Sequence, residues 1–583
     1  MLRLSGASAK AKAKVQHVRE GVREAVSSPQ AFLRAIETKK AATLRGQEDE
    51  RSFWRNEDLD LSPPEDWTWT WKNYAMFWWS YGFSSGVWTI GSSLISIGLN
   101  YWQGGGNPAI ICVFISHLLG AIGMAMHSRS GAVYHFGFPV ASRITWGMWG
   151  SFFPVFVRTL VGTVWIGLNN VESGYFVAIV LRCIFGDSYY KMHNPIPASS
   201  SITLQNFIGL IIYMVCTLPL LWVPVPKIRV LFTIKSFVVP PIVIGLFIFC
   251  MLQNKAGGGP VISNGVSLSG ARLAWAMLSG INSTMGKTAS NVVNQPDLAR
   301  YARRRNAPMW SQLLALPIGN TACAVLGIFA TSAVKNAWSL KTAIWNPWDL
   351  CHAVLTRYWN AGSRVGIAIV AIGWAFSLTA SNIGVNVIPW GADISIYFPR
   401  FINIRRGMYL SYAACLVFLP WKILASATTF LRFLGGYTIF LGPFVGIFLT
   451  DYLVVRKGNI YTEDLFSSSK TGRYWYTYGI HWRAVVAYIV AVVIPIPGFV
   501  SLWGYTLASG ALKLYDLGWI LTCIVSSIVY FALSFVGTMA EEERKMAFEE
   551  LAGPEIDRKV LLEGMDIETG SIEKAYTTPN KVD

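Results

Sequence analysis

The sequence predicts an all-α polytopic membrane protein with 12 transmembrane helices. Of its 583 residues, 53% are hydrophobic and only 14% are charged, whereas soluble domains carry about 25% charged residues. The mean hydropathy is +0.40. The 25 Trp and 24 Tyr residues suit the two headgroup layers of a bilayer, where an aromatic ring can keep a polar edge in water.

Apolar runs long enough to cross a bilayer recur along the chain, at about 20 residues per crossing. We place the spans at 74–98, 107–126, 150–181, 204–223, 231–252, 270–293, 310–333, 364–389, 408–425, 427–454, 483–502 and 517–538. The expected organisation is an N-terminal tail over 1–70, a transmembrane domain over 71–540 and a C-terminal tail over 541–583.

The distribution of basic residues predicts the orientation, because cytoplasmic loops are enriched in Lys and Arg. An even number of spans puts both tails on one side, and alternate loops on that side are basic. These loops contain Arg129, Arg143, Lys227, Arg229, Arg300, Arg303, Arg304, Arg305, Arg400, Arg405, Arg406, Arg456, Lys457, Lys470 and Arg473. The exceptions on the other side are Lys335, Lys341, Arg357 and Arg364. The first 70 or so residues lack the apolar core of a secretory signal. From the even number of spans and the basic loops, both termini are predicted to be cytoplasmic.

Several function classes are excluded. The net charge of +17 lies mainly in tails and short loops, which indicates membrane topology and anionic lipid rather than nucleic acid. The eight Cys show no paired spacing that would indicate a disulfide framework or a metal site. Motifs of ATPases, metalloproteases and serine hydrolases are absent from the sequence. We therefore expect no enzyme and no cofactor, and transport driven by an ion gradient or by the substrate's own gradient.

Two spans contain glycine and small polar residues at corresponding places. The first holds Gly82–Gly86 and the sixth holds Ser279–Gly286. Broken helices at these positions are typical of a five-plus-five inverted repeat, in which the freed backbone groups face a ligand at the midplane. The alternative is that these glycines only allow close helix packing.

Lys287 lies in the middle of the sixth span. A lysine at the centre of a membrane helix costs roughly 2.5–3.5 kcal/mol on insertion scales, so it normally faces a polar cavity or a partner. Asp297 and Arg300 follow at the end of this span, where an i,i+3 ion pair is the expected arrangement.

The third span carries a pair of side chains suited to a flat ring. Trp165 and Asn169 are four residues apart and therefore lie side by side on a helix. The indole would stack on a heterocycle while the amide binds its polar edge. The alternative is a packed Trp and an Asn bonded to a neighbouring helix. Arg158 and Glu172 in the same span indicate ion pairs with other helices or a proton path.

Spans eight and ten offer two further groups. Ser377, Ser381, Asn382 and Asn386 form a polar stripe on one helical face, which favours a ligand-facing role over interhelical hydrogen bonding alone. In span ten, the i,i+4 spacing of Phe433 and Tyr437 fits either an aromatic gate or a packed ridge.

Five sequence blocks together resemble a known family. The block Asn294–Tyr301 reads Asn-Gln-Pro-Asp-Leu-Ala-Arg-Tyr, and it resembles the signature after the sixth span of the nucleobase-cation-symport-1 family, in particular its fungal uracil, uridine and allantoin permease branch. The other blocks are Gly98–Gln103, Phe138–Arg143, Phe401–Gly407 and Asp451–Tyr461. The resemblance covers about residues 65 to 540 and leaves out the tails.

The resemblance implies the 12-span fold of the sodium-coupled amino-acid symporters, with two helices added to the five-plus-five repeat, and alternating access around a midplane site. Position by position, it assigns substrate binding to Trp165, Asn169, Gly286, Lys287, Asn382, Asn386, Phe433 and Tyr437. It implies a cation-coupling region at Ser84 in the stretch 83–86 of span one, and at Ser377 and Ser381 of span eight. Ala380 lacks the hydroxyl ligand of sodium-coupled relatives, which favours proton coupling.

Membership also implies a plasma-membrane permease that imports a heterocycle such as uracil, uridine or allantoin. Asn169 departs from the Gln common in uracil and allantoin carriers, and its side chain is about 1.5 Å shorter, enough to lose a hydrogen bond or admit a water. Uric acid, thiamine and nicotinamide riboside therefore stay open as substrates. A non-transporting sensor on the same fold is the alternative from another class.

Overall fold

The computed structural model describes residues 27–38, 53–99, 107–254, 268–467, 469–501, 505, 508–536 and 545–553. In these residues, regular structure is entirely helical apart from two isolated β-bridges. Seven of the described helices are long and apolar enough to cross a bilayer, and an eighth is added if one bent pair counts as a span. The all-α polytopic fold class is confirmed, and the described helices are consistent with 12 crossings.

The predicted spans correspond to long helices joined by short ones. The first half contains α3 (Trp71–Gly82), α4 (Ser85–Ser93), α5 (Pro108–Tyr134), α7 (Phe152–Phe185), α9 (Leu204–Thr217) and α10 (Arg229–Gln253). The second half contains α11 (Gly270–Val293), α13 (Ala307–Ala337), α15 (Ala361–Asn382), α17 (Ile404–Ala414) and α18 (Ala427–Leu449). The chain then forms α19 (Trp482–Val493), α20 (Ile496–Val500), α21 (Ser509–Asp516) and α22 (Gly518–Leu533).

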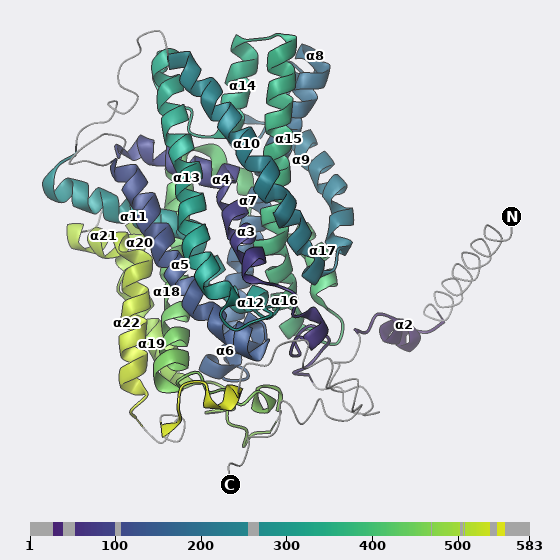
Figure 1. Ribbon diagram of the computed structural model, residues 1–583, viewed down its shortest axis with the longest axis vertical. Coiled ribbons are helices and arrows are strands. Elements are labelled where there is room, and N and C mark those ends of the chain that lie inside the picture. The colour runs from purple at the N-terminus through teal and green to yellow at the C-terminus, as the bar shows by residue number, and fades with distance from the viewer. Residues whose placement is uncertain are drawn as a thin grey trace.

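Several short helices lie at the two ends of the bundle. They are α6 (Phe138–Trp146), α8 (Asp187–Tyr190), α12 (Gln295–Ala299), α14 (Pro347–Arg357) and α16 (Ile388–Tyr397), together with the peripheral α2 (Pro29–Ala35). Figure 1 places α6, α12 and α16 at the lower end of the bundle and α14 at the upper end. A π-helical turn over Ile383–Val387 joins α15 to α16. The sequence predicts only connections at α6 and α14, since their 9 and 11 residues are too few to cross a bilayer. The structure shows that these connections are helical.

The two predicted helix breaks have different outcomes. In span one the helix ends at Gly82, Phe83 leaves helical geometry (φ −82°, ψ 74°), and α4 begins at Ser85. The break predicted within 279–286 of span six is wrong, since α11 is continuous to Val293 and the helix is interrupted only at Asn294. Gly286 serves packing instead, because a Cβ there would lie 2.4 Å from the carbonyl oxygen of Leu434 on α18.

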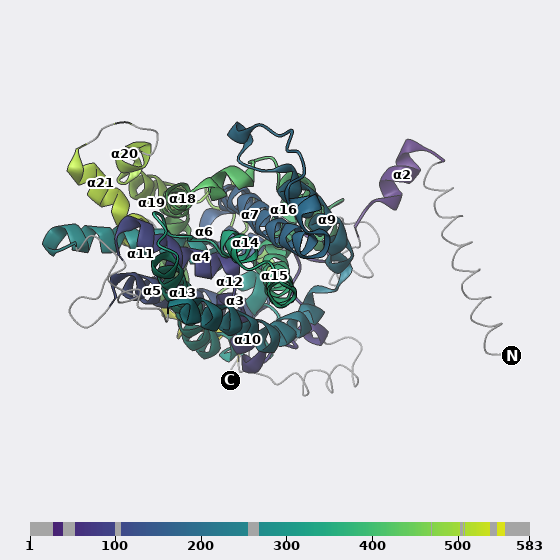
Figure 2. The same ribbon diagram turned by 90° about the horizontal axis from the view of Figure 1, so that it is seen from above.

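The helices pack in the pairs expected of an inverted repeat, in which the first helix of each half packs on the second helix of the other half. The first span packs on the seventh (α3 on α13), and its counterpart, the sixth, packs on the second (α11 on α5). The third and eighth spans, α7 and α15, pack on each other. In the view from above, α5, α11 and α13 lie on one side of the molecule, and α7, α9, α15 and α16 lie on the other (Figure 2).

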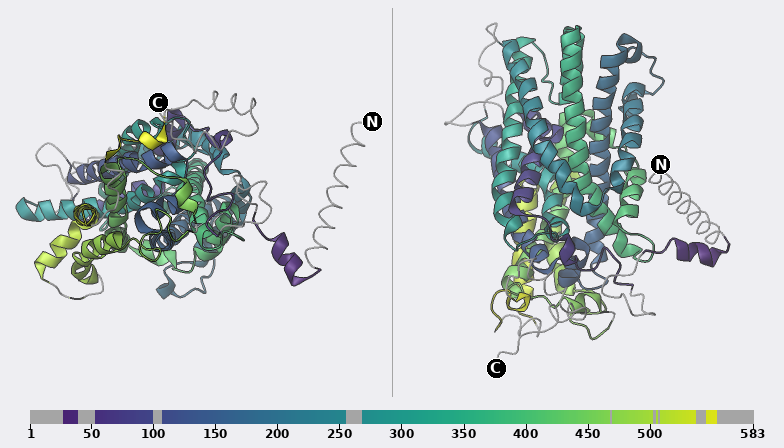
Figure 3. Two further views of the ribbon diagram at one scale, coloured as in Figure 1. Left: turned by 90° about the horizontal axis from the view of Figure 1, so that it is seen from below. Right: turned by 45° about the vertical axis from the view of Figure 1, so that its right-hand side comes forward.

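The described terminal segments lie toward the same end of the bundle, the end that holds α6, and α2 stands to the side of the bundle (Figures 1 and 3). Arg143, counted above as a loop charge, is in fact fully buried in α6, where it donates to the carbonyl oxygens of Trp54 (3.1 Å) and Leu465 (2.8 Å).

Burial raises the pKa of the Asp58 carboxyl to about 6, although this carboxyl accepts a 2.7 Å hydrogen bond from the Ile404 backbone. Placement of both segments at one end agrees with an even number of crossings.

Candidate functional site

Three helices bring the predicted aromatic residues together with Gly286. The Trp165 indole on α7 donates a 2.9 Å hydrogen bond to the Tyr437 hydroxyl on α18, and that hydroxyl donates to the Gly286 carbonyl on α11. The Phe433 ring lies 6.2 Å from the indole and 5.2 Å from the Tyr437 ring, centroid to centroid. Spans three, six and ten therefore meet at one buried place, as the family resemblance implied.

Lys287 is buried in the protein and does not face lipid. Its side chain is 5% exposed, and its ammonium nitrogen lies 4.5 Å from the centre of the Trp165 ring and 5.5 Å from that of Tyr81. Glu172 on α7 lies within electrostatic range of this ammonium, and its Oε2 accepts a 2.6 Å hydrogen bond from Ser85 on α4. The lysine thus lies among spans one, three and six, the elements assigned to the midplane site.

Amide groups of the polar stripe form hydrogen bonds within the protein. The Asn382 amide donates to the Ile166 carbonyl (3.3 Å) and to Asn170 Oδ1 (3.0 Å), both on α7. Asn386 donates to Asn382 Oδ1 at 2.9 Å, and Asn169 donates to the Trp165 carbonyl at 2.8 Å. Asn382 therefore joins α15 to α7, and the amides of Asn169 and Asn386 each keep a second N–H and an oxygen that can bind a substrate.

Two of the predicted coupling residues, Ser84 and Ser377, lie at the break in span one, and the third, Ser381, contacts a lysine of span five. Ser377 donates a 2.6 Å hydrogen bond to the Phe83 carbonyl. The Ser84 hydroxyl is buried and has no hydrogen-bond partner in the described part of the chain. Ser381 accepts a 2.5 Å hydrogen bond from the ammonium group of Lys235 on α10, a residue that is completely buried.

The sequence analysis did not identify Lys235, although a signal was present. Lys235 interrupts the apolar run of span five, and the insertion cost that singled out Lys287 applies equally to it. Only the structure shows that its ammonium group reaches span eight.

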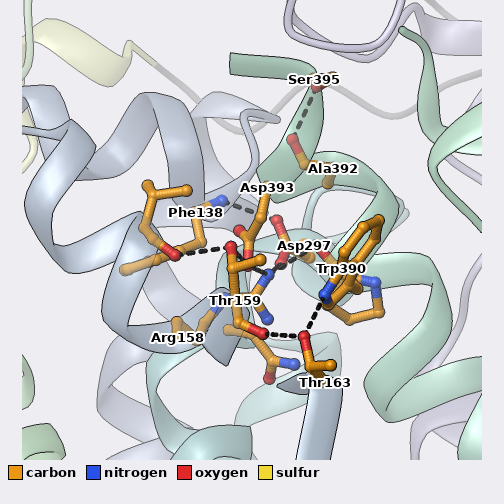
Figure 4. A network of polar contacts seen from close by, with 12 residues as sticks. Phe138, Arg158, Thr159, Thr163, Asp297, Trp390, Ala392, Asp393 and Ser395 are labelled. Atoms are coloured by element: carbon orange, nitrogen blue, oxygen red, sulfur yellow. Dashed lines mark hydrogen bonds and ion pairs between the residues drawn. The ribbon is translucent and has the colours of Figure 1, made fainter. Parts of the chain in front are cut away.

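A buried ionic network connects spans three and eight with the segment after span six (Figure 4). The Arg158 guanidinium forms an ion pair with Asp393 Oδ2 on α16 and lies 3.8 Å from Asp297 Oδ2 on α12. Asp297 also accepts a 2.8 Å hydrogen bond from the Phe138 backbone on α6. The expected pairing of Asp297 with Arg300 is wrong: Arg300 donates to Ser62 and to two backbone carbonyls of the N-terminal segment. Tertiary contacts thus override the i,i+3 spacing.

Sequence comparison decides the family. A family model described as "Permease for cytosine/purines, uracil, thiamine, allantoin" matches residues 62–522. This chain belongs to that permease family. It is therefore a membrane transporter rather than an enzyme, with the helical fold described above.

Similar proteins include three permeases of Saccharomyces cerevisiae. The chain is 32% identical to a uracil permease and 31% identical to an allantoin permease, in each case over 83% of this chain and 76% of the relative. It is 30% identical to a uridine permease, over 84% of this chain and 76% of that protein. Among solved structures, it resembles Mhp1, a nucleobase-cation-symport-1 family transporter, with bromovinylhydantoin bound, with a TM-score of 0.62 and 18% identity, over 84% of this chain and 99% of Mhp1. This likeness confirms the fold of the permease.

Replacing Gly286 with alanine is expected to lower the free energy of unfolding by about 1–3 kcal/mol, the usual cost of overpacking a tight core. The added methyl group would meet the backbone of Leu434, so α11 and α18 would have to separate. Unfolding of the purified permease in detergent measures the effect. Gly245→Ala on α10 is the matched control, since nothing lies within 4 Å of a Cβ there. Equal unfolding midpoints for the two variants would contradict the close contact.

Proposed function

We propose that this permease is a proton-coupled symporter of the plasma membrane, with both tails in the cytoplasm, which imports a planar heterocycle such as a nucleobase, nucleoside or hydantoin-like compound. Its relatives are named as uracil, allantoin and uridine permeases, and the Mhp1 structure has a bromovinylhydantoin bound. The basic loops on one side and the placement of both described terminal segments at one end support the orientation.

The observation that carries the proposal is the buried meeting of Trp165, Tyr437 and Lys287 between α7, α11 and α18. An indole presents a flat apolar face to a ring, and stacking on aromatic side chains tolerates different bases. We assign stacking to Trp165 and binding of the polar edge of the ring to Asn169, Lys287 and Asn386. Asn382 orients Asn386 through their 2.9 Å hydrogen bond.

Proton coupling is supported by the position of Lys235. Its ammonium group contacts Ser381 in the region where sodium-coupled relatives are expected to bind their cation. A lysine can lose and regain its proton in a buried site, which a guanidinium does not do in proteins. We propose that a proton on Lys235 takes the place of the metal cation at the break between α3 and α4.

The experiment is an uptake panel in cells that lack their own carriers. Radiolabelled uracil, uridine, allantoin, thiamine and nicotinamide riboside are offered to cells expressing the permease. Accumulation of uracil, uridine or allantoin is expected. Accumulation of thiamine or nicotinamide riboside alone would instead indicate the substrates of the thiamine and nicotinamide riboside transporters of Saccharomyces cerevisiae, to which this chain is 27% and 26% identical. No accumulation of any compound would favour a sensor.

Trp165→Ala is expected to weaken substrate binding by about 1–3 kcal/mol, the range measured for loss of one base-stacking aromatic ring. The readout is the concentration for half-maximal uptake, corrected for permease at the cell surface. Trp310→Ala is the control, because this tryptophan on α13 is 61% exposed. The stacking assignment fails if both variants take up substrate with the wild-type concentration dependence.

A further inference from the structure

Three buried asparagines form a chain of hydrogen bonds that runs from span eight to span nine. Asn386 donates to Asn382 Oδ1 (2.9 Å), and Asn382 donates to Asn170 Oδ1 (3.0 Å). Asn170 donates to the sulfur of Cys415 (3.4 Å), whose thiol donates to the Tyr412 carbonyl (3.3 Å). The chain thus connects the π-helical turn after α15 with α7 and with the end of α17.

A backbone carbonyl fixes the direction of this chain. Asn382 also donates to the Ile166 carbonyl oxygen at 3.3 Å, and a carbonyl oxygen can only accept. The amide nitrogen of Asn382 must therefore face α7, and its oxygen must face Asn386. Exchanging the two atoms would set an oxygen against the Ile166 carbonyl and an NH2 group against that of Asn386. The hydrogen bonds thus decide the orientation of the Asn382 amide.

This direction decides what Asn386 offers to a ligand. One N–H of Asn386 is held by Asn382, and within the described residues its other N–H and its oxygen have no partner. An amide held by its oxygen would offer both N–H groups instead. A donor beside an acceptor matches the C=O and N–H of a cyclic amide, whereas two donors match two acceptors. Hydrogen bonds in one direction also polarise one another, so a ligand N–H that donates to the Asn386 oxygen would strengthen the chain.

We propose that Asn170 is a positioning residue for substrate selection. It is completely buried and acts through Asn382, which it holds in the orientation that leaves Asn386 ready for a ring N–H beside a ring carbonyl. A ring whose nitrogens are alkylated cannot donate to the Asn386 oxygen. The inference rests on the proposed function, which assigns Asn386 to the polar edge of the ring. It narrows the substrate class to heterocycles with an unsubstituted ring N–H beside a carbonyl.

Competition for uptake into cells that lack their own carriers tests the inference. The tracer is whichever of radiolabelled uracil, uridine and allantoin accumulates. The competitors are uracil and 1,3-dimethyluracil, in which both ring nitrogens carry a methyl group and no N–H remains. For the wild-type permease, uracil should compete at concentrations at least about tenfold lower than dimethyluracil, because the methylated ring leaves polar groups of the site unpaired.

Asn170→Leu should raise the uracil concentration needed for half-maximal competition by about 2- to 13-fold, the effect of one net hydrogen bond. The concentration of dimethyluracil should change by less than about twofold, since this ring makes no such bond in either protein. The ratio between the competitors should therefore fall. Maximal uptake per permease at the cell surface should change much less than the half-maximal concentrations.

Variants at the other end of the chain test the same role with smaller changes. Cys415→Ser keeps an acceptor for Asn170 and a donor for the Tyr412 carbonyl, so the wild-type ratio should be preserved. Cys415→Ala removes both groups and should lower the ratio by a smaller factor than Asn170→Leu, because sulfur is a weak acceptor. These variants decide the matter if Asn170→Leu does not reach the cell surface.

Gln312→Leu is the matched control. Gln312 is another buried amide that joins two helices: from α13 it donates to the Met124 carbonyl and to the Ser128 hydroxyl on α5, both at 2.9 Å. Loss of this amide should reduce the amount of permease at the cell surface but leave the ratio between the competitors unchanged. A change of the ratio therefore distinguishes positioning from a general structural defect.

The possible results separate this inference from the proposed function. An unchanged ratio in both Asn170→Leu and Cys415→Ala would overturn the positioning role, while uptake of the tracer would leave the proposed function standing. Equal competition by uracil and dimethyluracil in the wild-type permease would overturn selection for a ring N–H in the same way. If the wild-type permease takes up no heterocycle, or only thiamine or nicotinamide riboside, which carry no ring N–H, both proposals fall.

Discussion

Cells expressing Lys235→Met are expected to take up substrate only until its concentrations inside and outside are equal. Methionine keeps the length and apolar character of the lysine side chain but removes the charge that contacts Ser381. In the proposed mechanism, the proton on Lys235 couples transport to the proton gradient. The buried site should tolerate the change, since replacing a buried charged group with an apolar one of similar size is often neutral for stability.

The readout is accumulation of radiolabelled substrate over a range of external pH values, with and without a protonophore. Wild-type accumulation should decrease as external pH rises and collapse with the protonophore, while Lys235→Met should respond to neither. Lys227→Met is the matched control, because Lys227 lies just before α10 and is exposed. Concentrative, pH-dependent uptake by Lys235→Met would show that the proton is carried elsewhere.

Arg158→Ala is expected to lower the free energy of unfolding by about 3–5 kcal/mol, the cost of removing one partner from a buried ion pair. The carboxylates of Asp393 and Asp297 are almost completely buried. Without the guanidinium they would face each other with no positive partner from α7. Thermal and denaturant unfolding in detergent measure the loss.

The surface pair of Lys191 and Asp187 provides the comparison. Their side chains are 71% and 59% exposed and lie 2.6 Å apart, so Lys191→Ala should cost no more than about 1 kcal/mol. A double-mutant cycle with Arg158→Met and Asp393→Leu isolates the pair itself. A coupling energy near zero would mean that the network in Figure 4 does not stabilise the fold.

The same arginine connects the two groups of helices in the bundle. Asp393 and Arg158 belong to spans eight and three, which pack together, whereas Asp297 follows span six of the opposite helix group. The 3.8 Å contact of Arg158 with Asp297 thus crosses between the two groups, while its ion pair with Asp393 stays within one.

Hydropathy was sufficient for the fold class, since a bilayer demands about 20 apolar residues for each helical crossing. The same physics singled out Lys287, because a charge inside such a run needs a buried environment. Local helix geometry placed Trp165 next to Asn169 and Phe433 next to Tyr437. The break in span one was also predictable, because Gly82–Gly86 concentrates glycine and serine. These features depend on residues close together in the chain.

Pairing between distant residues could not be predicted this way. Lys235 meets Ser381 across 146 positions, and Trp165 meets Tyr437 across 272. The glycines of span six predicted a broken helix, yet α11 is unbroken, and Gly286 allows α18 to pack closely on it. Arg158 lies close to Asp393 and Asp297, which belong to other helices. These contacts depend on which faces of the helices lie together. Only tertiary packing decides this, because many arrangements of the helices satisfy the same hydropathy pattern.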